Sequence, residues 1–79
     1  MRTIASKESD ILALDVRFDK EMMHVRLGDG REISVPVAWF PKLRNASAKQ
    51  RKNWRLIAKG VGIHWPDLDE DISVSALLK

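Results

Sequence analysis

The residues best suited to chemistry lie together near the carboxyl end, in the stretch 60–73. It reads Gly-Val-Gly-Ile-His-Trp-Pro-Asp-Leu-Asp-Glu-Asp-Ile-Ser, with one histidine, His64, just before a run of carboxylates. An imidazole near carboxylates could act as a general base, but the sequence supplies no neighbouring nucleophile or orienting group for it. The chain has no cysteine, which excludes thiol catalysis, disulfides and zinc–thiolate sites. We therefore expect a protein that is not an enzyme and needs no cofactor.

The carboxylates of this stretch have the spacing of the first ligands in a calcium loop. Asp67, Asp69 and Asp71 occupy alternate positions. An EF-hand loop also needs glycine at its sixth position and glutamate at its twelfth, where this chain has Ile72 and Leu78. An EF-hand is therefore excluded. Two simpler interpretations stay open, namely a weak divalent site that includes the neighbouring histidine, and carboxylates that cap the last helix and pair with upstream arginines.

The formal net charge of +3 is divided unevenly along the chain. The segment 41–59 has no acidic residue, and its basic residues are Lys42, Arg44, Lys49, Arg51, Lys52, Arg55 and Lys59. The acidic stretch follows directly, with only Lys79 basic after Gly60. Opposite charges separated in this way either pair within the molecule or bind separate partners.

A chain of 79 residues with 44% hydrophobic content suits one small domain. Residues 1–10 are polar and without periodicity, so we expect a flexible leader followed by a single domain over 11–79. The sequence has neither a signal-peptide pattern nor an apolar run long enough for a membrane span, which predicts a cytoplasmic protein without membrane contact. A small core without disulfides favours self-association or a stable, small protein partner.

Alternating apolar and polar residues predict strands over 11–18, 22–27 and 31–37. The residues expected on the buried face are Leu12, Leu14, Val16, Phe18, Met23, Val25, Leu27, Ile33, Val35 and Val37. The sequence Gly28-Asp29-Gly30 predicts a type I′ hairpin turn between the second and third strands. The expected product is a three-stranded antiparallel meander, whose single apolar face needs a cover.

The expected cover is one main helix. Ser47 and Gln50 have the spacing of a capping box, and Gly60 suits the left-handed residue after a helix, which predicts a helix from Ala48 to Lys59. The residues assigned to its solvent face are Lys49, Lys52, Arg55 and Lys59. A short extended segment over 63–65 and a short helix over 74–78, capped by Ser73, complete an α+β fold.

Two sets of residues are candidates for binding. Those assigned to a protein partner are Trp39, Phe40, Pro41, Arg51, His64, Trp65, Asp67, Asp69, Glu70 and Asp71. They combine aromatic side chains with charges, as protein interfaces do. The alternative is nucleic acid, bound by the basic helix 48–59 through phosphate contacts from Lys49, Lys52, Arg55 and Lys59. The sequence lacks the helix-turn-helix, zinc module or RNP motif that would favour this alternative.

Two motifs add a family resemblance. The segments Pro36-Val37-Ala38-Trp39-Phe40-Pro41 and Gly-Ile-His-Trp-Pro-Asp-Leu-Asp-Glu-Asp over 62–71 resemble the bacterial domain of unknown function family 2442. The resemblance spans nearly the whole chain and implies a small α+β domain, with a meander before a helix and no established catalytic residues. Some members are encoded beside another small protein family and have been proposed as antitoxins of toxin–antitoxin pairs. The leading hypothesis is therefore a non-enzymatic, antitoxin-like interaction module, with a nucleic-acid-binding regulator as the alternative.

Overall fold

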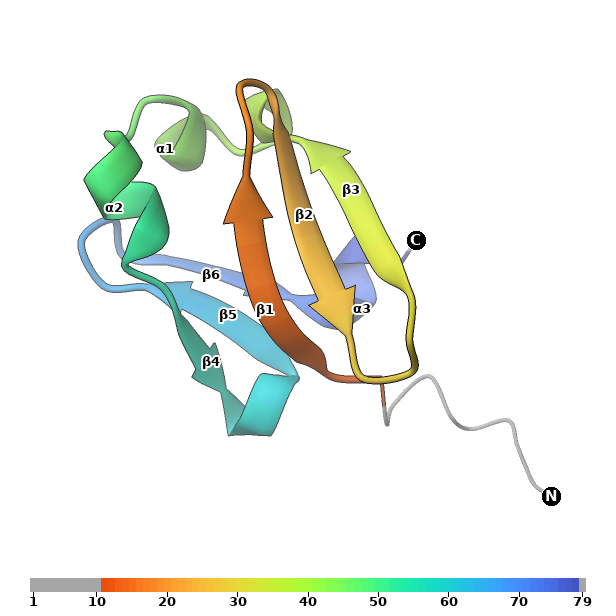
Figure 1. Ribbon diagram of the computed structural model, residues 1–79. Helices are drawn as coiled ribbons and strands as arrows, with labels where there is room; N and C mark the ends of the chain where they lie inside the picture. The colour runs from red at the N-terminus through yellow and green to blue at the C-terminus, as the bar shows by residue number, and fades with distance from the viewer. Residues whose placement is uncertain (1–10, 79) are drawn as a thin grey trace, which may run out of the picture.

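The computed structural model describes residues 11–78, and the leader expected over residues 1–10 lies outside them. The described residues form two antiparallel sheets of three strands each, connected by short helices (Figure 1). The first sheet contains, in order, β1 (Ala13–Phe18), β2 (Met22–Leu27) and β3 (Glu32–Pro36). The second contains β4 (Arg55–Ile57), β5 (Gly62–Trp65) and β6 (Glu70–Ser73). In Figure 1 the strands β5 and β6 pass behind the first sheet and cross its strands at a large angle.

The predicted meander is present as the first sheet. Val16 of β1 lies opposite Val25 of β2, which in turn lies opposite Ile33 of β3. Met23, Val25 and Leu27 are buried, as expected, because alternate residues of a strand face the same side. The hydrophobic periodicity of β2 therefore predicted its buried face correctly.

The buried face of β1 differs from the prediction at Leu14. The pairing with β2 shifts between Ala13 and Asp15, which lie opposite the consecutive residues Leu27 and Arg26. Leu14 is thus the extra residue of a β-bulge, and the bulge reverses the alternation before it. Ala13 is consequently buried, whereas Leu14 is 51% exposed. The assignment of Leu14 to the core is wrong because a strict period of two does not reveal a bulge.

The hairpin between β2 and β3 is present, but its turn is not type I′. Gly30 has a φ of 97°, whereas Gly28 and Asp29 have no positive φ. The N–H of Gly30 donates to the carbonyl of Leu27 at 3.1 Å, and the N–H of Leu27 donates to the carbonyl of Arg31 at 2.8 Å. This pattern is typical of a three-residue loop that ends in one left-handed glycine. The backbone N–H and then the guanidinium of Arg31 bind Asp29, which lowers the pKa of that carboxyl.

The prediction of one main helix over 48–59 is wrong. The predicted α+β fold, a meander covered by that helix, is therefore wrong as well. The predicted capping box does begin α2 (Ala48–Lys52), where the N–H of Gln50 donates to Oγ of Ser47 and the N–H of Ser47 donates to Oε1 of Gln50. At five residues, α2 is the longest helix between residues 11 and 78. The chain then becomes β4, because pairing with β5 outweighs the helical preference of Arg55 and Leu56.

A tight turn, η3 (Ala58–Gly60), joins β4 to β5. Ala58, Lys59 and Gly60 have positive φ angles of 52°, 65° and 115°. Gly60 is left-handed as predicted, but it lies in this turn and not after a helix. A Cβ at Gly60 would lie 2.6 Å from the carbonyl oxygen of Ala13 and 2.9 Å from the Cβ of Leu12. Gly60 is therefore required both for its backbone angle and for the close contact between η3 and β1.

The second sheet covers the first in place of the expected helix. The buried apolar residues of the first sheet are Ala13, Val16, Met23, Val25, Leu27 and Val35, and those of the second are Ile63, Trp65 and Ile72. All of them belong to one core cluster. The predicted extended segment over 63–65 is thus the central strand of the second sheet, since β5 pairs with both β4 and β6.

Short helices close the ends of this core. Val37 of η2 (Val37–Trp39) and Leu43 of α1 (Pro41–Arg44) are buried at one end of the first sheet. The predicted last helix is present as α3 (Val74–Leu77), and Oγ of Ser73 caps it by accepting the N–H of Ala76 at 3.2 Å. No helix within residues 11–78 is long and apolar enough to cross a membrane.

Candidate functional site

The edge strand β4 is the most exposed part of the second sheet. It hydrogen-bonds β5 on one side, and no strand of the described chain pairs with its other side. The register places Leu56 beside Ile63, and Ile63 beside Ile72, in one apolar row. Ile63 and Ile72 are buried, whereas Leu56 at the end of the row is 36% exposed. The apolar row of the core therefore continues to an open sheet edge.

The exposed apolar surface continues around β4. Ile57 is 40% exposed and packs over Gly62, and Val61 just after η3 is 49% exposed. Because consecutive strand residues point to opposite faces, Leu56 and Ile57 expose apolar atoms on both sides of the same strand. We call Leu56, Ile57 and Val61 the β4 edge. Single exposed apolar residues are ordinary, but a group of them on an edge strand is a surface on which another chain can pair.

Basic side chains flank the β4 edge. Lys52 ends α2, Arg55 begins β4 and Lys59 lies in η3, and all are exposed. Among the described residues, no carboxylate oxygen lies within 4.0 Å of their charged nitrogens. The helix that was expected to carry them on one face, together with Lys49, does not exist. These cations are instead divided among α2, β4 and η3.

A groove lies beside the start of β4, between the end of β1 and α2. It has a volume of about 410 Å³ and is lined by Val16, Arg17, Phe18, Asp19, Ala48, Arg51, Lys52 and Trp54. Its lining thus combines apolar and aromatic side chains with three basic residues and one acidic residue, Asp19. Trp54 directly precedes β4, so the groove and the β4 edge adjoin along the chain. Sequence analysis missed this groove because it depends on contact between β1 and α2.

Arg51 builds the wall of this groove. Its Nε donates to the carbonyl of Leu43 at 2.9 Å, and its Nη2 donates to the carbonyl of Arg44 at 3.1 Å. Its guanidinium lies 5.7 Å from the ring centre of Phe18, and its own carbonyl accepts the indole N–H of Trp65 at 3.0 Å. The ring of Phe18 packs edge-to-face on Trp65, with centres 6.4 Å apart. Arg51, assigned to a partner by sequence, therefore connects α1, α2, β1 and β5 within the molecule.

The structure separates the histidine and the tryptophan of the Gly-Ile-His-Trp-Pro motif. Trp65 is fully buried, so it belongs to the core and offers no surface to a partner. His64 faces the other side of β5, with Arg55 and Asp71 as its cross-strand neighbours. Nδ1 of His64 hydrogen-bonds Oδ1 of Asp71. Within residues 11–78, no group of three or more histidine, aspartate or glutamate side chains is placed to hold a metal ion.

The acidic stretch forms a turn and a strand, and it does not cap the last helix. Asp67 accepts a hydrogen bond from Nδ2 of Asn53 at 3.1 Å, and the carbonyl of Asp69 accepts one from Nζ of Lys42 at 3.1 Å. Asp69 has a positive φ of 51°, which completes the turn before Glu70 opens β6. These contacts hold the stretch against α1 and the residue that follows α2, and none of the residues 67–71 lines the groove.

The residues Trp39, Phe40 and Pro41, which follow the first sheet, also differ in their burial. Trp39 ends η2 with 67% of its surface exposed, whereas Phe40 is half-buried against the core. Pro41 occupies the first turn of α1, where its missing N–H and fixed φ are tolerated. Of these assigned residues, Trp39 therefore presents the largest free apolar surface.

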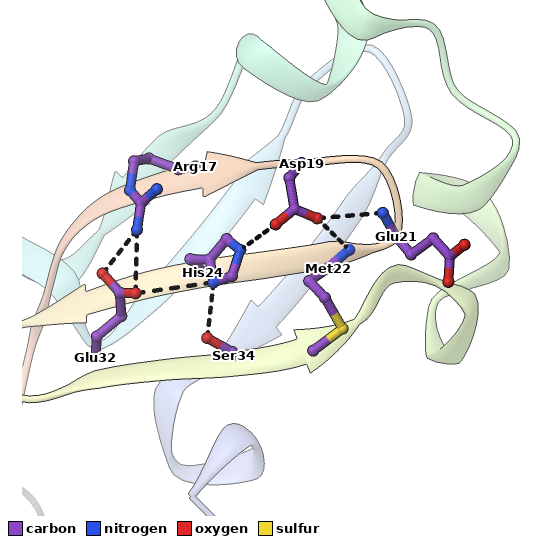
Figure 2. Close-up of polar contacts among 7 residues, drawn as sticks. All are labelled: Arg17, Asp19, Glu21, Met22, His24, Glu32 and Ser34. Carbon is purple, nitrogen blue, oxygen red and sulfur yellow. Dashed lines mark hydrogen bonds and ion pairs between the residues drawn. The ribbon is translucent and has the colours of Figure 1, made fainter.

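A polar cluster that sequence analysis missed lies on the outer face of the first sheet. Nε2 of His24 lies 2.7 Å from Oδ2 of Asp19, and Nδ1 lies 2.7 Å from Oγ of Ser34 (Figure 2). Oδ1 of Asp19 also accepts the N–H groups of Met22 and Glu21, at 3.0 and 3.2 Å. The hydrogen bond with His24, followed by that from Met22, lowers the pKa of Asp19 below its ordinary value of 3.8.

This cluster has the residue types of a Ser-His-Asp triad without its surroundings. Ser34 is exposed on a strand and does not line the groove. Glu32 approaches Nδ1 of His24 to 3.8 Å and binds Arg17 through both carboxylate oxygens, at 2.9 and 3.0 Å. We interpret the cluster as a cross-strand ladder that fixes the register of the first sheet. Aligning the outward residues Arg17, His24 and Ser34 across the two hairpins would have revealed it.

The fold defines a small domain of two antiparallel sheets with short connecting helices. A family model described as "Protein of unknown function (DUF2442)" matches residues 13–79, so the chain belongs to this family. A crystal structure of a protein of unknown function from Rhodospirillum rubrum ATCC 11170 is similar, with a TM-score of 0.74 and 28% sequence identity; the match covers 86% of this chain and 84% of that one. No curated protein matches the chain. The resemblance seen in the sequence is thus confirmed at the level of the family.

Proposed function

We propose that this protein is a non-enzymatic interaction module that binds an extended segment of a protein partner along β4, in an antitoxin-like role. The observation that carries the proposal is the apolar row of the core, which ends in the exposed Leu56 on β4, a strand that pairs with β5 on one side and with no other strand of residues 11–78. A strand added beside β4 gains backbone hydrogen bonds and covers Leu56 and Ile57 with its own side chains. The family resemblance supports the antitoxin-like form of this role.

The charges beside β4 favour a different protein over a second copy of the chain. Pairing β4 with its own copy would bring Lys52, Arg55 and Lys59 close to the same cations, and like charges across paired strands are destabilising. The strand is also only three residues long, and short charged edges are a common protection against self-pairing. A neutral or acidic partner strand meets no such repulsion.

The nucleic-acid alternative has lost the helix on which it depended. Lys49 and Lys52 belong to α2, Arg55 to β4 and Lys59 to η3, so they share no helical face along which a phosphate backbone would run. The exposed apolar residues between these cations also favour a protein strand over phosphates. The experiment that tests protein binding should therefore also detect nucleic-acid binding.

The test is a pull-down from native lysate, with and without nuclease, using matched variants. The double variant Leu56→Thr/Ile57→Thr removes the apolar edge and keeps strand preference, because threonine favours strands. Leu14→Thr is the control, since Leu14 is an exposed leucine on the β-bulge of the first sheet. We expect the wild type and the control to retain one small protein in near-equal amounts after nuclease treatment. The double variant should retain at least about tenfold less.

Two results would overturn the proposal. Equal recovery of the partner by the double variant would show that β4 is not the binding surface, once circular dichroism has shown all forms to be folded. Recovery of nucleic acid alone, lost after nuclease or in high salt, would favour the nucleic-acid-binding alternative.

A further inference from the structure

We infer that the groove beside β4 binds an acidic side chain of the partner segment, so that the partner is recognised by a carboxylate next to its strand. The inference rests on the proposed function and extends it, because it states which chemistry the partner must carry.

Lys52 is the cation of the groove that is most open to an incoming carboxylate. Arg17 is held by both oxygens of Glu32, and Arg51 is held by backbone carbonyls of α1. Lys52 is exposed, and no carboxylate of residues 11–78 lies within 4.0 Å of its Nζ. The one acidic lining residue, Asp19, already accepts hydrogen bonds from the backbone and contacts His24.

The walls of the groove favour a carboxylate on an aliphatic stem. Trp54, Phe18, Val16 and Ala48 line it with apolar surface, against which the methylene groups of a glutamate side chain pack. A phosphate brings no such stem, and a phosphate monoester would also bring a second negative charge, which Asp19 at the same groove repels. The lining therefore suits a singly charged acid of a protein segment.

The groove is within reach of a strand bound on β4. Trp54, which lines the groove, is followed directly by Arg55, the first residue of β4. An extended chain advances about 3.4 Å per residue, so a partner strand that continues past Arg55 reaches the groove within about two residues. The acidic residue should consequently stand at a fixed distance from the apolar residues that cover the β4 edge.

The carboxylates of the acidic stretch 67–71 do not line this groove. Asp67 hydrogen-bonds Asn53, and Asp71 hydrogen-bonds His64 on the outer face of the second sheet. No residue of the acidic stretch 67–71 lines the groove. The intramolecular pairing that the separated charges of the sequence allowed is therefore not formed at Lys52, and the site is complementary to an external acid.

The experiment is a selection from a displayed library of random peptides on the wild type and three variants. We expect the wild type to enrich peptides with an alternating apolar segment and a glutamate or aspartate at a fixed offset. Lys52→Glu should replace this acidic preference with lysine or arginine at the same offset and leave the apolar segment unchanged. Lys49→Glu is the matched control, since Lys49 is a neighbouring cation of α2 that does not line the groove. Leu56→Thr/Ile57→Thr should abolish enrichment.

The outcomes separate the two proposals. If the apolar segment is enriched without an acidic preference, or if Lys52→Glu and Lys49→Glu shift the preference equally, the groove inference is overturned and the function of β4 stands. If the wild type enriches no peptide, both fall. A synthetic copy of an enriched peptide, with its acid changed to the amide, should bind the wild type about fivefold more weakly and bind Lys52→Glu no more weakly than the acidic form.

Discussion

Arg51 adds hydrogen bonds at the ends of two very short helices, in one case to the carbonyl of Leu43, which also accepts the N–H of Ala46. The last carbonyls of an α-helix have no partner within the helix, and in a four-residue helix such as α1 this concerns most of its length. Arg51 donates to the carbonyls of Leu43 and Arg44 in α1, and its own carbonyl near the end of α2 accepts from buried Trp65. One residue therefore stabilises the ends of both helices, which explains how such short segments persist.

Arg51→Ala should lower the free energy of unfolding by about 2 kcal/mol, because it removes two charge-assisted hydrogen bonds and leaves the carbonyls without these donors. Arg51→Lys should recover less than half of the loss, since an ammonium lacks the planar fork. Urea unfolding measures the effect. The matched control, Lys49→Ala on the exposed side of α2, should change stability by less than about 0.5 kcal/mol. Equal effects of Arg51→Ala and Lys49→Ala would contradict this role.

Asp19 should make stability depend on pH in the acid range. Its pKa in the folded protein is lowered, mainly by the hydrogen bond with His24, so the ionised carboxylate stabilises the fold above the ordinary value of 3.8. The contribution is lost as the pH falls through the lowered folded-state value. Asp19→Asn should therefore destabilise the protein at neutral pH and progressively less in acid below pH 3.8. Unfolding of both forms across this range is the measurement, and a difference that does not change with pH would contradict the assignment.

The hairpin of β4 and β5 has the most constrained turn among residues 11–78. Ala58, Lys59 and Gly60 all have positive φ, and Gly60 is pressed against β1. The turn therefore sets where the second sheet contacts the first. By contrast, the hairpin of β2 and β3 ends in Gly30, around whose Cβ position no other atom lies within 4 Å.

Gly60→Ala and Gly30→Ala form a matched pair that separates the cost of backbone strain from the cost of a steric clash with β1. Both place a Cβ at a positive φ, which costs about 1–2 kcal/mol. Gly60→Ala adds a collision with the backbone of Ala13, so its total cost should be about 3 kcal/mol or more. Thermal unfolding of the two variants gives the comparison. A smaller effect of Gly60→Ala than of Gly30→Ala would show that β1 and η3 are not in contact in solution.

The helices and strands differ in how well their sequences predicted them. The strands of the first sheet, the capping box of Ser47 and the last helix after Ser73 depend on neighbours along the chain, and their patterns predicted them correctly. The segment 54–57 depends on pairing with β5, and its helix-favouring residues hid that pairing. The groove needs Phe18 and Trp54 from distant segments to meet, which no local pattern encodes.

Within residues 11–78, the two sheets share one core. The buried residues of both sheets form one cluster, to which Val25 contributes from the first sheet and Ile63 from the second. Each sheet on its own would leave its apolar face in water, and a sheet with one apolar face must bury that face against another element. The two sheets should therefore unfold together.

Val25→Ala and Ile63→Ala should each lower stability by about 2 kcal/mol or more, since each leaves a cavity in the shared core. For a chain of this size, that corresponds to a fall in Tm of about 8 °C or more. Circular dichroism and tryptophan fluorescence should report one coincident transition for the wild type and for both variants. Separate transitions, with each variant shifting only one of them, would show that the sheets fold independently.

The hydrogen bond from Trp65 to Arg51 also protects one proton, the indole N–H of Trp65, whose exchange with solvent can be followed over time. The indole N–H of Trp65 is buried and bonded, whereas Trp39 is largely exposed to water. In deuterium oxide the indole signal of Trp39 should disappear at once, and that of Trp65 should persist until the protein opens as a whole. An NMR spectrum recorded over time therefore measures how often the native molecule opens, without any denaturant, and a bound partner segment that stabilises the fold would lengthen the lifetime of that one signal.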